Sequence, residues 1–178
     1  MRFNIAHGSV VGSHHHRSMK NNQDAYRYID KGVIQVGVVC DGCGSCPYSE
    51  IGANYGASYL TTQLMKYREA LLDSGDFKLA DLVTVVRSHM IADLALHKLN
   101  SSEFTQSYLF TIVGFLRIRD KICIFNEGDG YFEINGEPTM VDENNQPGYI
   151  AYNVLGRVGK MQIQTFDVAK VKNFIVAT

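Results

Sequence analysis

The clearest pattern in the chain is a run of β-branched apolar residues over 33–39, which has the length of a buried strand. The run breaks sharply at Asp41-Gly42, and Gly44 follows closely. A carboxylate at the end of a rigid strand, followed by glycines that let backbone approach a ligand, suits a hard metal ion or a phosphate. Asp-Gly is also a common turn dipeptide, so a tight turn without a ligand is the simpler alternative.

Apolar residues recur at helical spacing in two later stretches. The first begins at Ser49, a residue type typical of helix starts, and continues to about Arg68. A break at 73–76 separates it from a second helix, whose apolar stripe occupies 79–94 and which ends near Asn100. We expect both stripes to be core rather than cofactor-binding surfaces.

Strand-like patterns dominate the chain from Phe104 onward. The segments 108–119 and 121–126 are predicted to form a hairpin, and Asn135-Gly136 is a strong hairpin-turn signal. A weak alternation over 3–11 predicts a first strand, and the polar stretch 12–26 predicts a surface loop. Four further strands are predicted at 131–134, 150–155, 161–166 and 173–178.

Composition narrows the classes of protein. The chain has 178 residues, of which 46% are hydrophobic and 20% charged, as expected for one globular domain with a substantial core. With a net charge of -1, it has no basic field for nucleic acid or an anionic membrane. The sequence shows neither an apolar leader nor a membrane-length run, and its four cysteines do not suggest a secreted disulfide scaffold. We therefore expect a soluble, cytoplasmic protein.

Three aspartates stand at expected junctions between strands and loops. They are Asp24, Asp41 and Asp129, and each is followed by a small residue. Oxygen-rich sites with open water positions bind Mg²⁺ or Mn²⁺, and two such ions can activate a bridging water for phosphate ester hydrolysis. The three aspartates are therefore candidate metal ligands.

The polar loop before Asp24 carries a basic cluster that could receive a phosphoryl oxyanion. The cluster comprises His14, His15, His16, Arg17 and Lys20. A solvated polar loop without a ligand is an equally good interpretation of the same residues.

The cysteines offer a different metal chemistry. Cys40, Cys43 and Cys46 form C-x2-C-x2-C, with Cys123 as a possible fourth ligand. This spacing is typical of iron–sulfur sites, and zinc is also conceivable. Because Cys40 ends an apolar strand, a buried free thiol is the more probable state of that residue.

The order of several short motifs resembles the metal-dependent serine/threonine protein phosphatases of type 2C, in their compact bacterial branch. The resemblance covers essentially the whole chain and depends on order and spacing, because no single motif is specific. The matching motifs are Gly12-Ser-His14, Asn22-Gln-Asp-Ala25, Cys40-Asp-Gly-Cys-Gly-Ser45, Tyr48-Ser-Glu-Ile-Gly-Ala53, Phe110-Thr111 and Asn126-Glu-Gly-Asp-Gly130.

The resemblance implies an α+β fold, a four-layer α/β/β/α sandwich with two central antiparallel sheets and the metal site at one end of the sheets. Residues 1–178 would be a single phosphatase-like domain that is incomplete at its C-terminus. The family continues after a strand like Phe174–Thr178 with further aspartates that complete the metal site. The helices that cover the second sheet would also lie in that missing part.

The resemblance also assigns roles to the aspartates. Asp41 would bridge two Mg²⁺ or Mn²⁺ ions, and Gly42 would offer its backbone carbonyl to one of them. Asp24 would bind through water or sit just outside the metal ligands. Asp129 would serve a third, more weakly held ion.

Two positions depart from the family pattern. Met19 stands where the family has an arginine that grips substrate phosphate, so Arg17, His14 or Lys20 must take that role. Cys43 stands where some relatives carry a general-acid histidine. Protonation of the leaving group by a side chain is therefore not expected from this position.

The activity implied is Mg²⁺- or Mn²⁺-dependent hydrolysis of phosphoserine or phosphothreonine in a protein, by attack of a metal-bridged water on the phosphate. The implied partners are a phosphoprotein substrate, such as a serine/threonine kinase or its target, with no nucleic acid and no membrane. The alternative is a phosphatase-like regulatory or binding module that has lost turnover.

Overall fold

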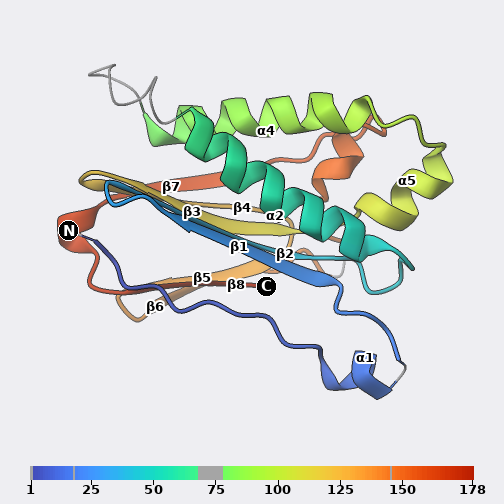
Figure 1. Ribbon diagram of the computed structural model, residues 1–178, viewed down its shortest axis with the longest axis horizontal. Coiled ribbons are helices and arrows are strands. Elements are labelled where there is room, and N and C mark those ends of the chain that lie inside the picture. The colour runs from blue at the N-terminus through green and yellow to red at the C-terminus, as the bar shows by residue number, and fades with distance from the viewer. Residues whose placement is uncertain (1, 18, 68–77, 145) are drawn as a thin grey trace.

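A computed structural model describes residues 2–17, 19–67, 78–144 and 146–178, with only the backbone at His14. The chain folds into two antiparallel β-sheets stacked face to face, with helices covering one of them (Figure 1). This arrangement confirms the predicted α+β class. The predicted break at 73–76 lies outside the described residues.

The larger sheet contains the β-branched run of the sequence as its second strand. Its order is β1-β2-β3-β4-β7, and all neighbouring strands are antiparallel. Because β3 has both faces covered, every residue in it is buried, which explains its nearly continuous apolar sequence. The strands are β1 (Asp24–Asp30), β2 (Ile34–Asp41), β3 (Ile112–Ile118), β4 (Lys121–Glu127) and β7 (Gln162–Asp167).

The smaller sheet has the order β6-β5-β8. β5 (Gly130–Ile134) and β6 (Glu137–Val141) are joined by the predicted hairpin turn at Asn135-Gly136. Both turn residues have positive φ, 56° and 88°, as a type I′ turn requires. β8 (Phe174–Ala177) pairs with the other side of β5, so the last strand predicted from the sequence is confirmed.

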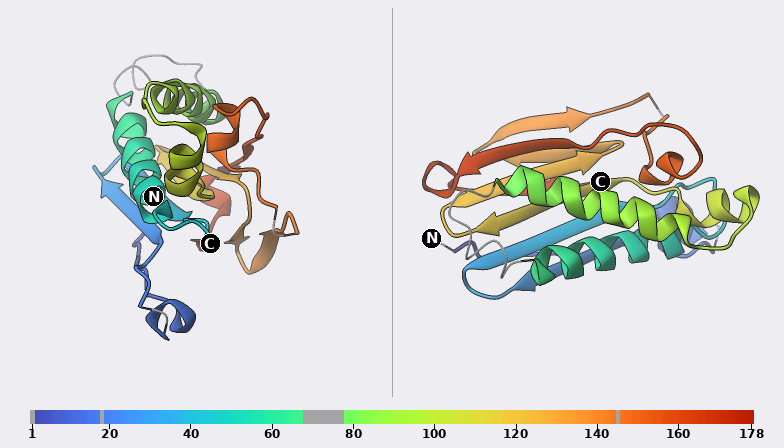
Figure 2. Two further views of the ribbon diagram at one scale, coloured as in Figure 1. Left: turned by 90° about the vertical axis from the view of Figure 1, so that its right-hand side faces the viewer. Right: turned by 90° about the horizontal axis from the view of Figure 1, so that it is seen from above.

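Two long helices cover the outer face of the larger sheet (Figure 2). α2 (Ser49–Lys66) packs on β1 and β2, and α4 (Leu79–Ala95) packs on β4 and β7. The predicted apolar stripe of α4 is buried as expected. Among the described residues, the helices that pack extensively on a sheet all contact this larger one, so the structure shows three of the four layers that the resemblance implied.

Two apolar cores hold the layers together. One lies between the helices and the larger sheet and includes Leu60, Met90 and Phe110. The other lies between the two sheets, where the ring of Phe115 contacts that of Phe174 at 4.8 Å between centroids. The same strand, β3, therefore contributes to both cores.

The structure corrects the N-terminal predictions. Residues 3–11 are not a strand, because Phe3 bonds through its backbone to the Gln35 side chain instead of a neighbouring strand. The predicted loop 12–26 contains a short helix, α1 (Ser13–Arg17), and the first residues of β1.

Two predicted strand segments are helical. Residues 104–108 belong to α5 (Ser101–Tyr108), which starts at a capping box formed by Asn100 and Glu103. The segment predicted as a strand over 150–155 begins with a 3₁₀ helix, η1 (Ile150–Asn153). A second 3₁₀ helix, η2 (Val168–Lys170), follows β7. In both wrong predictions a short segment with a few buried residues is helical, and periodicity over so few residues does not distinguish a helix from a strand.

Candidate active site

The first two candidate aspartates face each other at one end of the larger sheet. Asp24 is the first residue of β1 and Asp41 is the last residue of β2, and the antiparallel register makes them direct partners. Their side chains interact closely enough to share a hydrogen bond when Asp41 is protonated. The sheet itself therefore brings together two carboxylates that are 17 residues apart in the sequence.

The third candidate comes to the same end from the smaller sheet. Asp129 lies between β4 and β5 and adds to the negative charge around Asp41. Its Oδ1 atom accepts a hydrogen bond from the backbone of Glu143 at 2.6 Å, which fixes the orientation of the carboxylate. The positive φ of Gly128, 80°, makes the turn that presents Asp129.

Asp41 and Asp129 open into a hollow of about 180 Å³, here called the carboxylate hollow. Its wall combines acidic, hydroxyl and thiol groups at the ends of the two sheets. The lining residues are Asp41, Gly42, Cys43, Gly44, Thr111, Asp129, Pro147 and Tyr149. A larger groove of about 350 Å³ lies between the N-terminal segment and the larger sheet, and none of these residues lines it.

Thr111 contributes an unusual group to the carboxylate hollow. The residue is 4% exposed, and its Oγ1 atom has no hydrogen-bond partner among the described residues. Its backbone N–H donates to the Asp41 carbonyl at 2.8 Å, which ties the start of β3 to the end of β2. A buried hydroxyl without a partner is costly unless a ligand or water completes it.

Gly42 is required by the close packing of the turn. A Cβ atom at this position would lie 2.6 Å from the Gln23 carbonyl oxygen and 2.9 Å from that of Ser49. Because both contacts are with backbone atoms, position 42 has no room for a side chain. The sequence signal at Asp41-Gly42 therefore reflects a steric need in addition to the turn itself.

The crowding of carboxylates changes the acidity of Asp41. Desolvation, the hydrogen bond with Asp24, and the negative charges of Asp24 and Asp129 raise the pKa of Asp41 to about 7. A divalent cation bound there would relieve this repulsion. The raised pKa is thus a physical sign of a site whose charge is not balanced by the chain's own residues.

The donor atoms fit Mg²⁺ or Mn²⁺, because carboxylate and hydroxyl oxygens are the ligands that these hard cations prefer. Within the described part of the chain, no group of three or more histidine, cysteine, aspartate or glutamate side chains is arranged to hold a metal ion. The chain itself therefore contributes a close pair of carboxylates and nearby oxygen atoms as ligands for the metal ion. Such a set suits an ion that keeps several water ligands.

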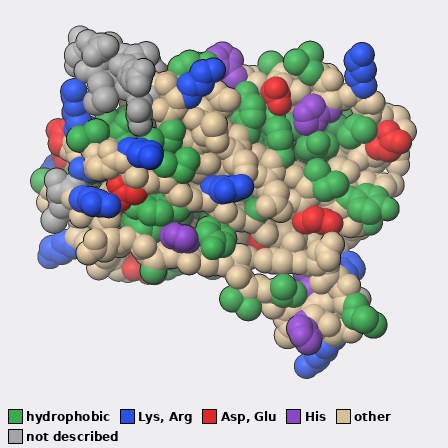
Figure 3. Space-filling view, viewed as in Figure 1, with side chains coloured by type: hydrophobic (Ala, Val, Ile, Leu, Met, Phe, Trp, Pro, Cys, Tyr) green, Lys and Arg blue, Asp and Glu red, His purple; other side chains and the backbone are tan. Residues whose placement is uncertain are grey.

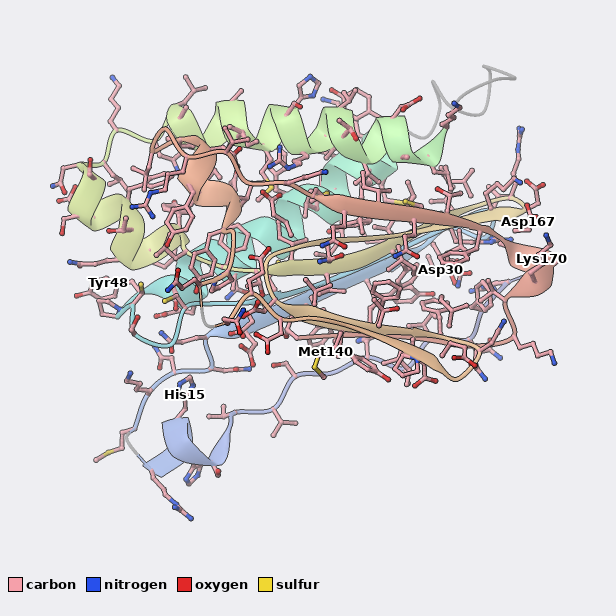
Figure 4. All side chains as sticks on the ribbon, turned by 180° about the vertical axis from the view of Figure 1, so that it is seen from behind. His15, Asp30, Tyr48, Met140, Asp167 and Lys170 are labelled. Atoms are coloured by element: carbon pink, nitrogen blue, oxygen red, sulfur yellow. The ribbon has the colours of Figure 1, made fainter. Side chains whose placement is uncertain are left out.

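The basic residues of the N-terminal segment divide into two groups. α1, which carries Arg17, projects from the body of the molecule, and Figure 4 shows its His15 apart from the sheets. Figure 3 shows the same projection with histidine and basic side chains on it. Arg17 is exposed there, and the side chain of His14 lies outside the described residues.

Lys20 is the basic residue that the structure brings to the turn after Asp41. Its Nζ atom donates to the Gly44 carbonyl at 3.0 Å. The neighbouring Asn21 donates to Glu50 at 3.3 Å, so the chain after α1 is tied to the start of α2. Of the three basic residues considered for phosphate binding, Lys20 is the one whose contact with the site region the structure defines.

The four cysteines do not form one cluster. Cys40 and Cys123 are fully buried, and burial raises the pKa of both thiols, that of Cys123 to about 12. Cys43 and Cys46 are only partly buried and lie in the turn after Asp41. No three of the four thiols are arranged to hold a metal ion in the described part of the chain, so the structure does not support the alternative of a cysteine-ligated cluster.

The two partly buried thiols differ in acidity. Burial opposes ionisation of Cys43, but hydrogen bonds from Ser45, Tyr149 and Cys46 outweigh it, so its pKa lies below the usual thiol value. Burial, followed by the contact with Cys43, raises the pKa of Cys46 to about 11. The hydroxyl-rich surroundings of Cys43 are part of the carboxylate hollow.

Comparison with known protein families identifies the family of this chain. The Protein phosphatase 2C family matches residues 11–178, which is nearly the whole chain. This chain belongs to the protein phosphatase 2C family. No curated protein sequence matches it significantly.

Solved structures of bacterial phosphatases share the 2C fold. A bacterial serine phosphatase with a point substitution superposes with a TM-score of 0.60 at 14% identity, covering 88% of this chain and 69% of its own. The serine/threonine phosphatase Stp1 from Staphylococcus aureus gives 0.55 at 14% identity, covering 88% and 70%. RsbX, solved in complex with magnesium, gives 0.50 at 13% identity, covering 88% and 66%. At these identities the similarity establishes the fold alone.

The structure adds site residues that the sequence did not single out as such. Thr111 belonged to the Phe110-Thr111 motif of the family resemblance but had no role assigned to it, and Tyr149 lies in a loop without a motif. Their place in the carboxylate hollow results from chain folding over long sequence distances.

None of the helices among the described residues has both the length and the apolar character of a membrane span.

Proposed function

We propose that this 2C-family chain is a Mg²⁺- or Mn²⁺-dependent protein serine/threonine phosphatase. The observation that carries the proposal is the pairing of Asp24 with Asp41 across β1 and β2, with Asp129 beside them. This geometry concentrates negative charge at a hollow that is open to solvent.

The chain's residues would act as follows. Asp41, Asp24 and Asp129 would hold divalent ions together with water, and the backbone carbonyl of Gly42 would be a further ligand. The ions, when bound, would supply the Lewis acidity that activates water for attack on a phosphate ester. Thr111 would donate or accept a hydrogen bond at the buried wall of the hollow.

Substrate phosphate would be held by the basic residues that precede Asp24. Lys20 is the best candidate for this role, because its ammonium group already lies against the turn at Gly44. Arg17 would reach the phosphate only if α1 approaches the body of the molecule, so it is a candidate for contact with a bound protein substrate. His14 stays a candidate on the family resemblance alone.

The substrate class follows from the family. We infer a phosphoserine or phosphothreonine in another protein, such as a serine/threonine kinase or its target, in the cytoplasm, without a role for nucleic acid or membrane. The hollow at Asp41, of about 180 Å³ and open to solvent, supports a phosphate presented on a flexible segment of the substrate.

The end of β8 supports a further proposal about the metal site. Ala177 and Thr178 line a hollow of about 240 Å³ that they share with Asp24. A ligand in this hollow would therefore lie beside the carboxylate pair. We infer that residues 11–178 belong to a single phosphatase-like domain.

A second candidate function is a phosphatase-like binding module without turnover. It is favoured by the absence, among the described residues, of any group of three or more acidic, histidine or cysteine side chains arranged to hold a metal ion. Such a module would keep the fold and bind a phosphoprotein without releasing phosphate.

Hydrolysis of an aryl phosphate and of a phosphothreonine peptide, with and without Mn²⁺, distinguishes the two functions. The proposal expects Mn²⁺-dependent release of phosphate that falls by about 100-fold or more in Asp41→Asn. Asp120→Asn is the matched control, because Asp120 is exposed at the turn between β3 and β4. Peptide binding without hydrolysis in the unaltered chain would support the binding module instead.

A further inference from the structure

The turn 43–46 contains two thiols that the phosphatase chemistry does not use. The Cys46 amide donates to the Cys43 carbonyl at 2.9 Å, and the two thiol groups are close enough to interact. Residues that close a turn in this way have Cα atoms within about 7 Å of each other. That separation overlaps the range in which a disulfide forms without a change of backbone.

The backbone of the turn is already fixed by its neighbours. Gln23 donates to the Cys46 carbonyl at 2.6 Å, and the Ser49 hydroxyl donates to the Cys43 carbonyl at 3.0 Å. Both ends are therefore anchored to buried side chains, since Gln23 and Ser49 are 3% and 0% exposed. Joining the two sulfur atoms would need side-chain rotation more than movement of the chain.

Solvent reaches the thiol of Cys43 but not the thiols in the core. Cys43 lines the carboxylate hollow, and its Sγ atom lies 3.2 Å from the Ser45 hydroxyl. Cys40 and Cys123, by contrast, are fully buried in the core next to the sheet. A small oxidant in solvent therefore reaches Cys43 through the hollow and is kept from the core thiols.

We propose that Cys43 and Cys46 are a hydroperoxide-sensitive dithiol that closes to a disulfide across this turn. The Cys43 sulfur attacks the O–O bond of the hydroperoxide, which gives the Cys43 sulfenic acid and releases the corresponding alcohol, or water from hydrogen peroxide. The Cys46 sulfur then attacks the sulfenic sulfur. The S–S bond forms, the S–O bond breaks, and water leaves. Two electrons pass from the thiols to the peroxide.

The disulfide changes the wall of the carboxylate hollow. In the reduced chain the Cys43 thiol interacts with the Tyr149 hydroxyl, and both residues line the carboxylate hollow. Moving that sulfur toward Cys46 breaks this contact next to Asp41. Oxidation of the two thiols would therefore regulate metal binding. This consequence rests on the proposed function.

Thiol counting after treatment of the reduced chain with hydrogen peroxide tests the dithiol directly. The expected result is loss of two of the four thiols, a mass lower by two hydrogen atoms, and full reversal by dithiothreitol. Cys43→Ser and Cys46→Ser should each abolish the paired loss, and Cys46→Ser should leave a sulfenic acid that dimedone labels.

Cys40→Ala and Cys123→Ala are the matched controls and should keep the paired loss. The proposal is overturned if the unaltered chain keeps four thiols, if Cys46→Ser still loses a pair, or if the loss comes from covalent dimers.

Thermal stabilisation by Mn²⁺, measured before and after oxidation, separates the disulfide from its consequence. A smaller Mn²⁺ shift in the oxidised chain supports the regulatory link, and an equal shift contradicts it. Absence of any shift in the reduced chain counts against the proposed function, whereas the thiol count still decides the disulfide.

Discussion

Asp41 is the residue at which the fold and the proposed chemistry meet. Its carboxylate ends β2, faces Asp24 and is exposed to solvent at the carboxylate hollow. The raised pKa means that the folded, metal-free chain binds a proton there that the unfolded chain has already released above its ordinary value of 3.8. The free energy of unfolding should therefore fall as pH rises from about 4 to about 7 and level off above that.

Replacing this charge should remove that pH dependence. Asp41→Asn is expected to stabilise the metal-free chain by about 1 kcal/mol at neutral pH, a modest value because solvent screens an exposed carboxylate. Urea unfolding at about pH 5 and about pH 8 measures the effect. Asp120→Asn should keep the slope of the unaltered chain, and an unchanged slope in Asp41→Asn would show that the carboxylates do not repel each other.

The two glycines after Asp41 allow a matched steric test. Gly42→Ala should lower the free energy of unfolding by about 1–3 kcal/mol, because its Cβ atom would collide with the backbone oxygens of Gln23 and Ser49. A Cβ atom on Gly44 meets nothing within 4 Å, so Gly44→Ala should change stability by no more than about 0.5 kcal/mol. Equal effects of the two substitutions would contradict the described packing.

At the scale of elements, a buried ion pair joins α4 to the strand that leads toward Asp129. Arg87 donates to both carboxylate oxygens of Glu127, at 2.8 and 2.6 Å, and also to the Gly159 carbonyl at 2.8 Å. The Glu127 side chain is completely buried and that of Arg87 is 15% exposed. Glu127 ends β4, two residues before Asp129, so this pair fixes the strand end that presents the third aspartate.

Breaking this pair should be costly. Arg87→Met is expected to lower the free energy of unfolding by about 3–5 kcal/mol, because it leaves the Glu127 charge buried and unpaired. Lys121→Met is the control, since the pair of Lys121 with Asp167 is exposed to solvent and its loss should change stability far less. The two pairs lie at opposite ends of β4, and Figure 4 places Asp167 far from the Tyr48 end of the molecule. Chemical denaturation of both variants decides the matter, and similar small losses would show that the Arg87 pair is not structurally important.

The elements that could be predicted are those whose patterns are long. α2 and α4 have many turns of regular apolar spacing, and β2 has an uninterrupted β-branched run. α5 and η1 could not be predicted, because each is too short for helical periodicity to stand out from strand alternation. The start of β1 was hidden because Asp24 and its polar neighbours look like loop residues when taken alone.

At the scale of the whole molecule, the site is a product of sheet register. The sequence indicated Asp24, Asp41 and Asp129 as candidates, and the order of motifs indicated the family, which the match over residues 11–178 confirms. The pairing of Asp24 with Asp41 and the burial of Thr111 depend on strand register and on contacts between distant segments. Such contacts leave no local signal in a single sequence, so neither the hollow nor the contact of Lys20 with the Gly44 carbonyl could be predicted.

Mn²⁺ binding to the whole chain tests whether the paired aspartates form a metal site. The electron paramagnetic resonance signal of free Mn²⁺ follows this binding. The account predicts that the chain takes up Mn²⁺, that Asp41→Asn weakens binding by about tenfold or more, and that Asp120→Asn does not. Binding that is absent in the unaltered chain, or that survives the loss of the Asp41 carboxylate unchanged, would contradict a metal site at the paired aspartates.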